Sequence, residues 1–240
     1  MAAVIHNFMC GRFAISSPAD VVSRRFGVRV SDNFPPRYNV APTQPIAVIR
    51  QDVNHSREYA LVRWGFIPSW AKGEQLQRAA ARPLINARGE TVAEKPTFRS
   101  AYKRRRCLVP ANGFYEWRTE QGRKQPYLVQ HDDGELIAFA ALWETALDPD
   151  GGEIDTAAII TTAAGPDIAS LHNREPVVIT PDAYGRWLEG DERDMKFIAP
   201  LIRAQPKGYW AYEKVSTAVN NVRNDGPDLL RPFGQAQLDF

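Results

Sequence analysis

Hydrophobic residues along the chain are grouped in short runs that predict β-strands. These runs are rich in β-branched and aromatic residues, and turn residues such as Asp132-Asp133-Gly134 separate them. Consecutive strands joined by tight turns favour antiparallel pairing. The expected strands are Ile46–Arg50, Tyr59–Phe66, Cys107–Val109, Phe114–Arg118, Tyr127–Gln130, Ile137–Trp143, Thr156–Thr162 and Val177–Ile179.

Helix signals are fewer. Ser17-Pro18-Ala19-Asp20 combines a capping residue, a proline at the first helical position and an acid three residues after the cap, which predicts a helix to about Phe26. Thr180-Pro181-Asp182 repeats this pattern and predicts a helix to about Leu188, and a third helix is expected over Asp194–Arg203. We therefore expect an α+β fold in which mixed, mostly antiparallel sheets form a barrel-like core with peripheral helices.

A single domain is expected over most of the 240 residues, because a chain of this length forms one globular unit. Residues 1–9 are interpreted as an N-terminal extension, since they are too weakly patterned for a signal peptide and Met9 is a second possible start. The domain is expected over residues 10–225. Residues 226–240, which begin with Gly226-Pro227, are expected to form an irregular C-terminal tail.

Composition narrows the function only slightly. The formal net charge is +2, from 30 basic and 28 acidic residues, so any nucleic-acid surface must come from local clusters of arginine and lysine. The two cysteines, Cys10 and Cys107, lack metal-type spacing. This favours a reducing, cytoplasmic setting without a metal or cofactor. No apolar run is long enough to span a membrane, and we expect a monomer.

Cys10 is the first candidate for chemistry. It could be a small buried hydrophobe. In a chain that begins at Cys10, however, an α-amine and a thiol would sit on adjacent carbons. An α-amine has a pKa of about 7.7–8.0, so part of it is uncharged at neutral pH and can attack an aldehyde to form a Schiff base. The thiol can then close a five-membered thiazolidine ring, which proximity favours. The open form of an abasic deoxyribose carries such an aldehyde.

Three further residues could assist this chemistry. Alternation along the expected strand puts Phe114 and Glu116 on one face, and an acid among aromatic rings can have its pKa raised toward neutrality. The alternative is an acid at a sheet edge that faces solvent. His172 could carry a second proton or be a surface histidine. Asn86 could orient the amine or the sugar, or belong to a turn.

A DNA-binding surface is suggested by segments that mix cations with aromatic rings. In Arg63-Trp64-Gly65-Phe66-Ile67-Pro68-Ser69-Trp70, exposed tryptophans could stack on bases while Arg63 holds a phosphate. The alternative is that Trp64 and Trp70 belong to the core. Arg99 and the run Lys103-Arg104-Arg105-Arg106 could track phosphates, or form only a solvated face.

Several motifs occur in a fixed order from about Cys10 to about Asp225. They are Cys10-Gly11-Arg12-Phe13, Arg37-Tyr38-Asn39-Val40-Ala41-Pro42-Thr43, Trp64-Gly65-Phe66-Ile67-Pro68-Ser69-Trp70, Asn86-Ala87-Arg88, Glu90-Thr91, Pro110-Ala111-Asn112-Gly113-Phe114-Tyr115-Glu116-Trp117, His172-Asn173-Arg174-Glu175-Pro176 and Val215-Ser216-Thr217-Ala218-Val219-Asn220. Together they resemble the SOS-response-associated peptidase family, whose members process abasic sites. The chain departs from the usual family pattern in two places: its cysteine is tenth instead of second, and Glu175 stands where methionine is usual.

The resemblance implies a barrel-like core and a positively charged groove for single-stranded DNA that contains abasic sites. It also implies that Cys10 becomes N-terminal and forms the thiazolidine crosslink. Asn86 would position the sugar and the cysteine, Glu116 would move protons, and His172 would assist ring opening and release. The implied DNA-contacting residues are Arg12, Asn39, Trp64, Arg88 and Arg174. Such a protein would be associated with the nucleoid when bound to DNA.

Two other functional classes remain open. The same residues could serve a peptidase or amidohydrolase with an N-terminal cysteine nucleophile, because an α-amine can act as the base for its own thiol. Removal of the residues before Cys10 would then be an autolytic act, and weak lyase or self-release activity could accompany the crosslink. The third possibility is a non-catalytic single-strand-binding module in which Cys10 stays internal.

Overall fold

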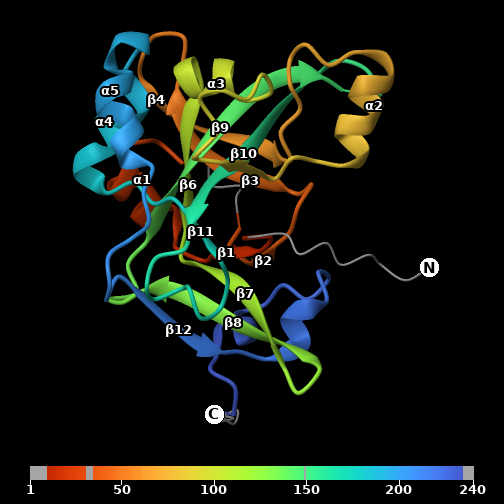
Figure 1. Ribbon diagram of the computed structural model, residues 1–240, viewed down its shortest axis with the longest axis vertical. Coiled ribbons are helices and arrows are strands. Elements are labelled where there is room, and N and C mark those ends of the chain that lie inside the picture. The colour runs from red at the N-terminus through yellow and green to blue at the C-terminus, as the bar shows by residue number, and fades with distance from the viewer. Residues whose placement is uncertain (1–9, 31–34, 149, 235–240) are drawn as a thin grey trace.

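A closed barrel of five strands lies at the centre of the computed structural model (Figure 1), which describes residues 10–30, 35–148 and 150–234. The expected extension, residues 1–9, and the end of the expected tail lie outside the described residues. In the order of pairing, the barrel strands are β10 (Glu153–Ala163), β4 (Arg57–Trp64), β3 (Pro45–Gln51), β6 (Arg106–Ala111) and β9 (Ile137–Leu147). β9 pairs with β10 to close the ring.

Barrel pairings are antiparallel except between β10 and β4, where Thr156 lies opposite Arg63 in parallel register. Two short strands add to the far end of β10: β5 (Asn86–Arg88) pairs in parallel, and β11 (Arg174–Pro176) pairs antiparallel. The expected α+β fold with mixed, mostly antiparallel sheets and a barrel-like core is thereby confirmed.

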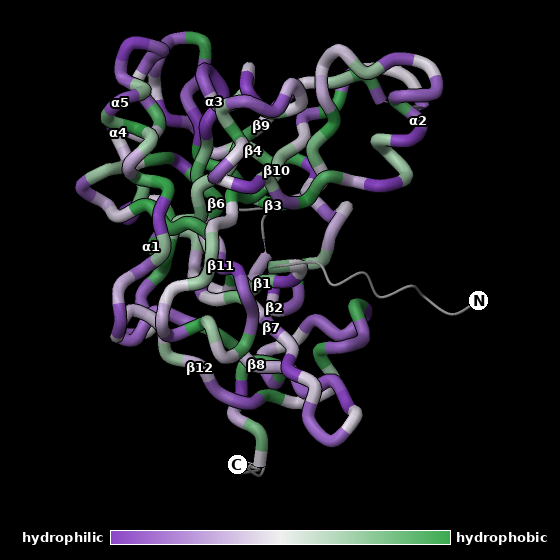
Figure 2. The backbone as a smooth tube through the Cα atoms, in the orientation of Figure 1, coloured by the Kyte–Doolittle hydropathy of each residue, from purple (hydrophilic) through white to green (hydrophobic). Residues whose placement is uncertain are grey.

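A second, antiparallel sheet packs against the barrel and forms the lower part of the molecule in Figure 1. Its order is β12 (Trp210–Lys214), β8 (Arg123–His131), β7 (Gly113–Glu120), β1 (Phe13–Ile15) and β2 (Arg37–Val40). The ring of Phe13 lies edge-on to Trp64 at 5.2 Å and to Phe139 at 6.1 Å, between centroids. These aromatic contacts join the two sheets, and Figure 2 shows hydrophobic residues concentrated along the barrel strands.

Helices are short and peripheral, as expected (Figure 1). They are α1 (Ala19–Phe26), α2 (Gly73–Ala81), α3 (Arg99–Arg104), α4 (Tyr184–Glu189) and α5 (Met195–Ile198). Short 3-10 turns cover Pro181–Ala183, Glu192–Asp194, Ala199–Leu201, Thr217–Asn220 and Pro227–Leu230. Within the described ranges, no helix is both long and apolar enough to cross a membrane.

Local details correct several sequence expectations. Ser17 does not cap α1, because its hydroxyl accepts a hydrogen bond from the Asn112 side chain at 2.8 Å. The expected helix over Asp194–Arg203 is shorter: α5 ends at Ile198, and a 3-10 turn that contains Pro200 follows it. Val177–Ile179 is not a strand apart from a single bridge at Val178, and the neighbouring strand is β11.

Candidate active site

Cys10 and Glu116 are brought together by the pairing of β1 with β7. Phe13 lies opposite Phe114 in this pairing, and the backbone N–H of Tyr115 donates to the Arg12 carbonyl at 3.0 Å. The backbone nitrogen of Cys10, just before β1, donates to Oε1 of Glu116 at 2.9 Å. Cys10 is 1% exposed and has a positive φ of 40°. The backbone nitrogen, which would be the amine of a chain beginning here, therefore already contacts the predicted proton carrier.

The environment of Glu116 raises its pKa to about 7. Burial is the main cause, because a charged carboxylate loses its hydration, and hydrogen bonds from the backbone of Cys10 and Trp117 oppose the shift. Glu116 is 3% exposed, and its neighbour on the same strand face, Phe114, belongs to the central core. The expectations of a shared face and a raised pKa are both confirmed, and the solvent-facing alternative is wrong.

The Cys10 thiol is held in its neutral form. Its pKa is raised well above the ordinary value, first by burial and then by the nearby Glu116 carboxylate. A neutral thiol is a weak nucleophile compared with a thiolate. This environment therefore favours chemistry that begins at the nitrogen of Cys10 and uses the thiol in a later step.

His172 lies in the turn before β11 and is half-buried. Its Nδ1 accepts the backbone N–H of Arg174 at 3.1 Å, so the proton of the neutral ring is on Nε2. Burial lowers the pKa of His172, because the charged imidazolium loses hydration. The ring is thus neutral at physiological pH and can donate through Nε2.

Asn86 begins β5 and is half-buried. It lies opposite Ile159 of β10, whereas β11, which follows His172, pairs with the end of the same strand at Ala163. Asn86 is therefore the start of a strand rather than a turn residue. Of the four expected catalytic residues, the structure joins Cys10 to Glu116 by a hydrogen bond, and both Asn86 and His172 adjoin strands that pair with β10.

Glu175 is buried and bonded to the protein backbone. It is 1% exposed, and its two carboxylate oxygens accept the backbone N–H groups of Gly165 at 2.7 Å and Gln205 at 2.6 Å. Arg174 pairs instead with Glu90, through two hydrogen bonds of 2.8 Å each. The departure from the family pattern at Glu175 thus adds two internal hydrogen bonds and does not place a negative charge on the surface.

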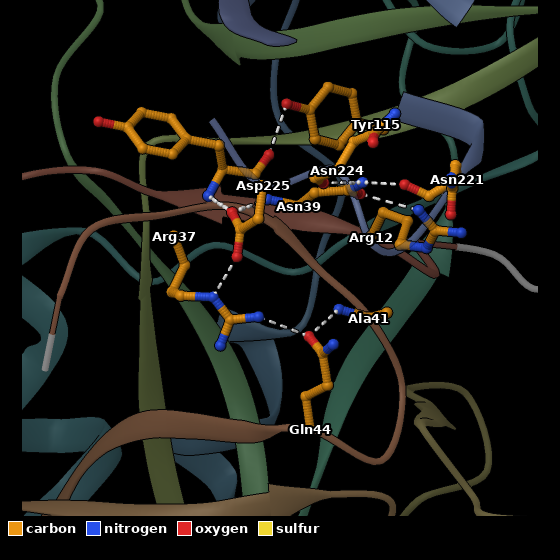
Figure 3. Close-up of polar contacts among 10 residues, drawn as sticks. Arg12, Arg37, Asn39, Ala41, Gln44, Tyr115, Asn221, Asn224 and Asp225 are labelled. Carbon is orange, nitrogen blue, oxygen red and sulfur yellow. Dashed lines mark hydrogen bonds and ion pairs between the residues drawn. The ribbon is translucent and has the colours of Figure 1, made fainter. Parts of the chain in front are cut away.

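Arg12 and Asn39 lie in an internal polar network (Figure 3). The Arg12 guanidinium donates to Asn39 Oδ1 at 2.8 Å and to the Val219 carbonyl at 2.9 Å. Asn39 is fully buried, so the expectation that it contacts DNA is wrong. The sequence interpretation also missed Asp225, which accepts the backbone N–H groups of Tyr38 and Asn39, although the polar run Asn220-Asn221 through Asn224-Asp225 was a signal for it.

Other expected DNA contacts are also engaged within the protein. Trp64 is 0% exposed and donates through Nε1 to the Ile85 carbonyl, so it belongs to the core and cannot stack on a base. The side chain of Arg174 is only 11% exposed, and Glu90 offsets its charge, which leaves little of it for a phosphate.

The cations of the run Lys103–Arg106 all make contacts within the protein. Lys103 and Arg104 pair with Glu192, and Arg105 pairs with Glu144. Arg106 is 3% exposed and donates to backbone carbonyls, among them those of Trp187 and Tyr102. These cations hold α3 and the region around α4 against the barrel.

Four of the expected DNA-binding residues remain accessible. Trp70 is 53% exposed and lines a shallow pocket with Gln75 and Leu84. Arg63 is half-buried, and Arg88 and Arg99 are exposed. Among the described residues, neither Arg88 nor Arg99 has an ion pair. Over the same part of the chain, no group of three histidine, cysteine or acidic side chains is arranged to hold a metal ion.

Comparison with known families agrees with this arrangement. The family model described as "SOS response associated peptidase (SRAP)" matches residues 9–222. The chain belongs to this family. The matched range includes Cys10, Asn86, Glu116 and His172, and it begins one residue before Cys10.

Relatives extend across bacteria and vertebrates. The abasic site processing protein YoqW of Bacillus subtilis (strain 168) is 35% identical over 92% of this chain and 99% of its own. YedK of Escherichia coli (strain K12) is 31% identical over 93% and 100%, and HMCES of Gallus gallus is 31% identical over 94% and 78%. Both are also named abasic site processing proteins.

Solved structures show the same fold. A crystal structure of a protein from Bacteroides thetaiotaomicron superposes with a TM-score of 0.80 at 24% identity, covering 93% of this chain and 99% of that one. A protein from Bordetella bronchiseptica gives a TM-score of 0.76 at 27% identity, covering 86% and 100%.

Proposed function

We propose that this SRAP protein processes abasic sites in single-stranded DNA by forming a covalent thiazolidine link through Cys10. The observation that carries the proposal is the hydrogen bond from the Cys10 nitrogen to Glu116 Oε1 at 2.9 Å. Its relatives are named abasic site processing proteins, which fits the aldehyde substrate that this chemistry requires. The active chain would begin at Cys10, after a start at Met9 or removal of the preceding residues.

The reaction needs one proton carrier beside the nitrogen. The free amine of Cys10 adds to the aldehyde of the open sugar and gives a carbinolamine. Glu116, protonated at its raised pKa of about 7, donates a proton to the leaving hydroxyl, and water departs to leave an iminium ion. The Cys10 thiol then forms a carbon–sulfur bond at the same carbon, and its proton returns to Glu116. Atoms and charges balance, and Glu116 ends in its starting form.

His172 and Asn86 are proposed to act on the sugar. The neutral His172 ring, which donates through Nε2, would assist opening of the sugar ring and reversal of the link. Asn86 would orient the sugar or the amine through its amide. Phosphates of the bound strand would meet Arg63, Arg88 and Arg99, and Trp70 would stack on a base.

A peptidase with Cys10 as its nucleophile is supported less well. The raised pKa of the Cys10 thiol opposes formation of a thiolate at neutral pH. Peptide turnover without DNA would favour that alternative, and peptide bonds left intact under conditions in which DNA becomes crosslinked would count against it.

The test compares chains with different starts on an oligonucleotide that carries one abasic site. A chain that begins at Cys10 is expected to give a band that resists denaturation, whereas Cys10→Ala with the same start should bind the strand without that band. A chain from Met1 with an uncleavable extension should behave like Cys10→Ala. A heat-stable adduct from the extended chain, with its intact mass confirmed after the reaction, would exclude the N-terminal amine as the nucleophile.

A further inference from the structure

The segment Ser216–Asp225, which we call the C-terminal strap, contacts the strands on both sides of the candidate site. It contains the 3-10 turn Thr217–Asn220 and the residues that follow to Asp225. Although it lies about 200 residues beyond β1 and β2 in the sequence, it meets both strands in the fold (Figure 3). Its contacts include hydrogen bonds, one ion pair and the packing of buried Val219 against Ala14 and Tyr115.

Asn39 of β2 anchors the middle of the C-terminal strap. Its amide nitrogen donates to the carbonyls of Val219, Asn221 and Asn224 at 3.1, 3.1 and 2.9 Å. Its amide oxygen accepts from Arg12 at 2.8 Å. The Asn39 side chain is fully buried, and its amide supplies both the donors and the acceptor for these bonds.

Asp225 anchors the end of the C-terminal strap. Its Oδ1 accepts the backbone N–H groups of Tyr38 at 2.6 Å and Asn39 at 3.1 Å. Its Oδ2 accepts from Nε of Arg37, whose Nη2 donates to Gln44 at 2.8 Å. Hydrogen bonds in which one or both partners are charged are stronger than neutral ones. The strap end is therefore fixed to the backbone of β2.

The C-terminal strap reaches both members of the proposed reacting pair. Arg12, two residues after Cys10, donates to the strap carbonyl of Val219 at 2.9 Å. Trp117, the residue after Glu116, donates from Nε1 to Oδ1 of Asn220 at 2.7 Å. The Arg12 guanidinium also lies 5.9 Å from the centre of the Trp117 ring. One segment thus holds the neighbours of both groups.

We propose that the C-terminal strap positions the Cys10 nitrogen against Glu116, with Asn39 and Asp225 as its positioning residues. The strap does not touch the substrate; it acts through Arg12 on β1 and through Trp117 on β7. This inference rests on the proposed function.

The experiment uses the chain that begins at Cys10, with Asp225→Asn and Asn39→Ala as variants. The first-order crosslinking rate at saturating abasic single strand is compared with the affinity for a strand that carries a non-reactive tetrahydrofuran analogue. We expect the rate to fall about 10- to 100-fold, because small misplacements of reacting groups cost this much, whereas the affinity should stay within about threefold.

Asp155→Asn is the matched control. Asp155 pairs with Arg50 and accepts from Thr145 in the barrel, away from the C-terminal strap, so its loss should lower the melting temperature without lowering the crosslinking rate. Wild-type crosslinking rates in Asp225→Asn and Asn39→Ala would overturn the proposal. So would an equal loss of rate in Asp155→Asn.

A readout without chemistry separates this inference from the proposed function. The N–H of Tyr115, which donates to the Arg12 carbonyl, should exchange with deuterium faster in Asp225→Asn than in Asp155→Asn. If wild type forms no crosslink but this exchange difference appears, the proposed function is wrong. The proposal that the C-terminal strap positions β1 against β7 would still be supported. Equal exchange in the two variants would contradict that role whatever the chemistry.

Discussion

Glu116 combines deep burial with contact to a nitrogen that becomes an amine only when the chain starts at Cys10. Burial raises its pKa to about 7, and the free amine expected beside it has a reference pKa of about 7.7–8.0. The acid must carry a proton to release water, whereas the amine must be uncharged to attack. The useful combination of protonation states is therefore confined to a narrow range around neutrality.

This pairing predicts a bell-shaped dependence of the crosslinking rate on pH. As pH rises above about 7, Glu116 loses its proton and can no longer act as the acid, so the rate falls. As pH drops, the amine becomes protonated and the rate falls again. Glu116→Gln should slow crosslinking by about 10²–10⁴-fold and remove the fall at high pH, as measured in time courses from pH 5 to 9. Wild-type rates in this variant would mean that Glu116 is structural.

At the scale of elements, the site depends on short strands whose partners are far away in the sequence. The strands β3, β4, β9 and β10 were predictable, because each has seven or more residues and a central group of hydrophobic or β-branched ones. β1 and β5 have three residues each, too few for a periodic signal, and only their distant partners make them strands. Trp64 shows the same limit, since the local sequence does not reveal which face of β4 the barrel covers.

Cys10, Glu116, Asn86 and His172 could be selected from the sequence, because motif order and residue chemistry are local information. The partners of Arg12, Asn39 and Arg174 could not, since they depend on register between distant segments. The position of Glu175 is a further example. Its carboxylate oxygens accept hydrogen bonds from the backbone of Gly165 and Gln205, and no sequence pattern predicts these bonds.

Replacing Glu175 should weaken the loop that carries His172. Glu175→Met leaves two backbone N–H groups buried without acceptors, each costing about 1–3 kcal/mol, so we expect the free energy of unfolding to drop by about 2 kcal/mol or more. Denaturant titration would measure this. Glu90→Gln, at a carboxylate that is 45% exposed beside Arg174, is the control and should cost less. A Glu175→Met protein as stable as wild type would show that the loop does not depend on the hydrogen bonds of Glu175.

Over the whole molecule, several of the arginines expected to bind DNA make contacts within the protein, among them Arg12, Arg63 and Arg174. The net charge of +2 therefore conceals differences among these residues: Arg12 and Arg174 bond within the protein, whereas Arg88 and Arg99 are exposed. Arg88 and Arg99, together with the partly covered Arg63, are the candidates that can meet phosphates. The affinity for single strands should accordingly rest on a small number of charges.

That distribution predicts a modest salt dependence of DNA binding. Each phosphate contact to a single strand contributes about −0.7 to the slope of log affinity against log salt. Arg88→Gln should reduce the slope by about that amount, as measured by fluorescence anisotropy at several salt concentrations. Arg104→Gln removes a cation that is paired with Glu192 and should leave the slope unchanged. A slope near zero in wild type would rule out a surface lined with phosphate contacts.

The positive φ of Cys10 has a consequence for the balance between the extended and shortened chains. A φ of 40° brings the β-carbon of a non-glycine residue close to backbone carbonyl oxygen, at a cost of about 1–2 kcal/mol. A first residue has no preceding carbonyl carbon, so this torsion ceases to exist and its strain is released. A chain that continues before Cys10 therefore carries this torsional strain at the N–Cα bond of Cys10, and the chain that begins at Cys10 lacks it. Cys10→Gly should accordingly be more favourable to the stability of the chain from Met1 than to that of the chain from residue 10, by about 1 kcal/mol.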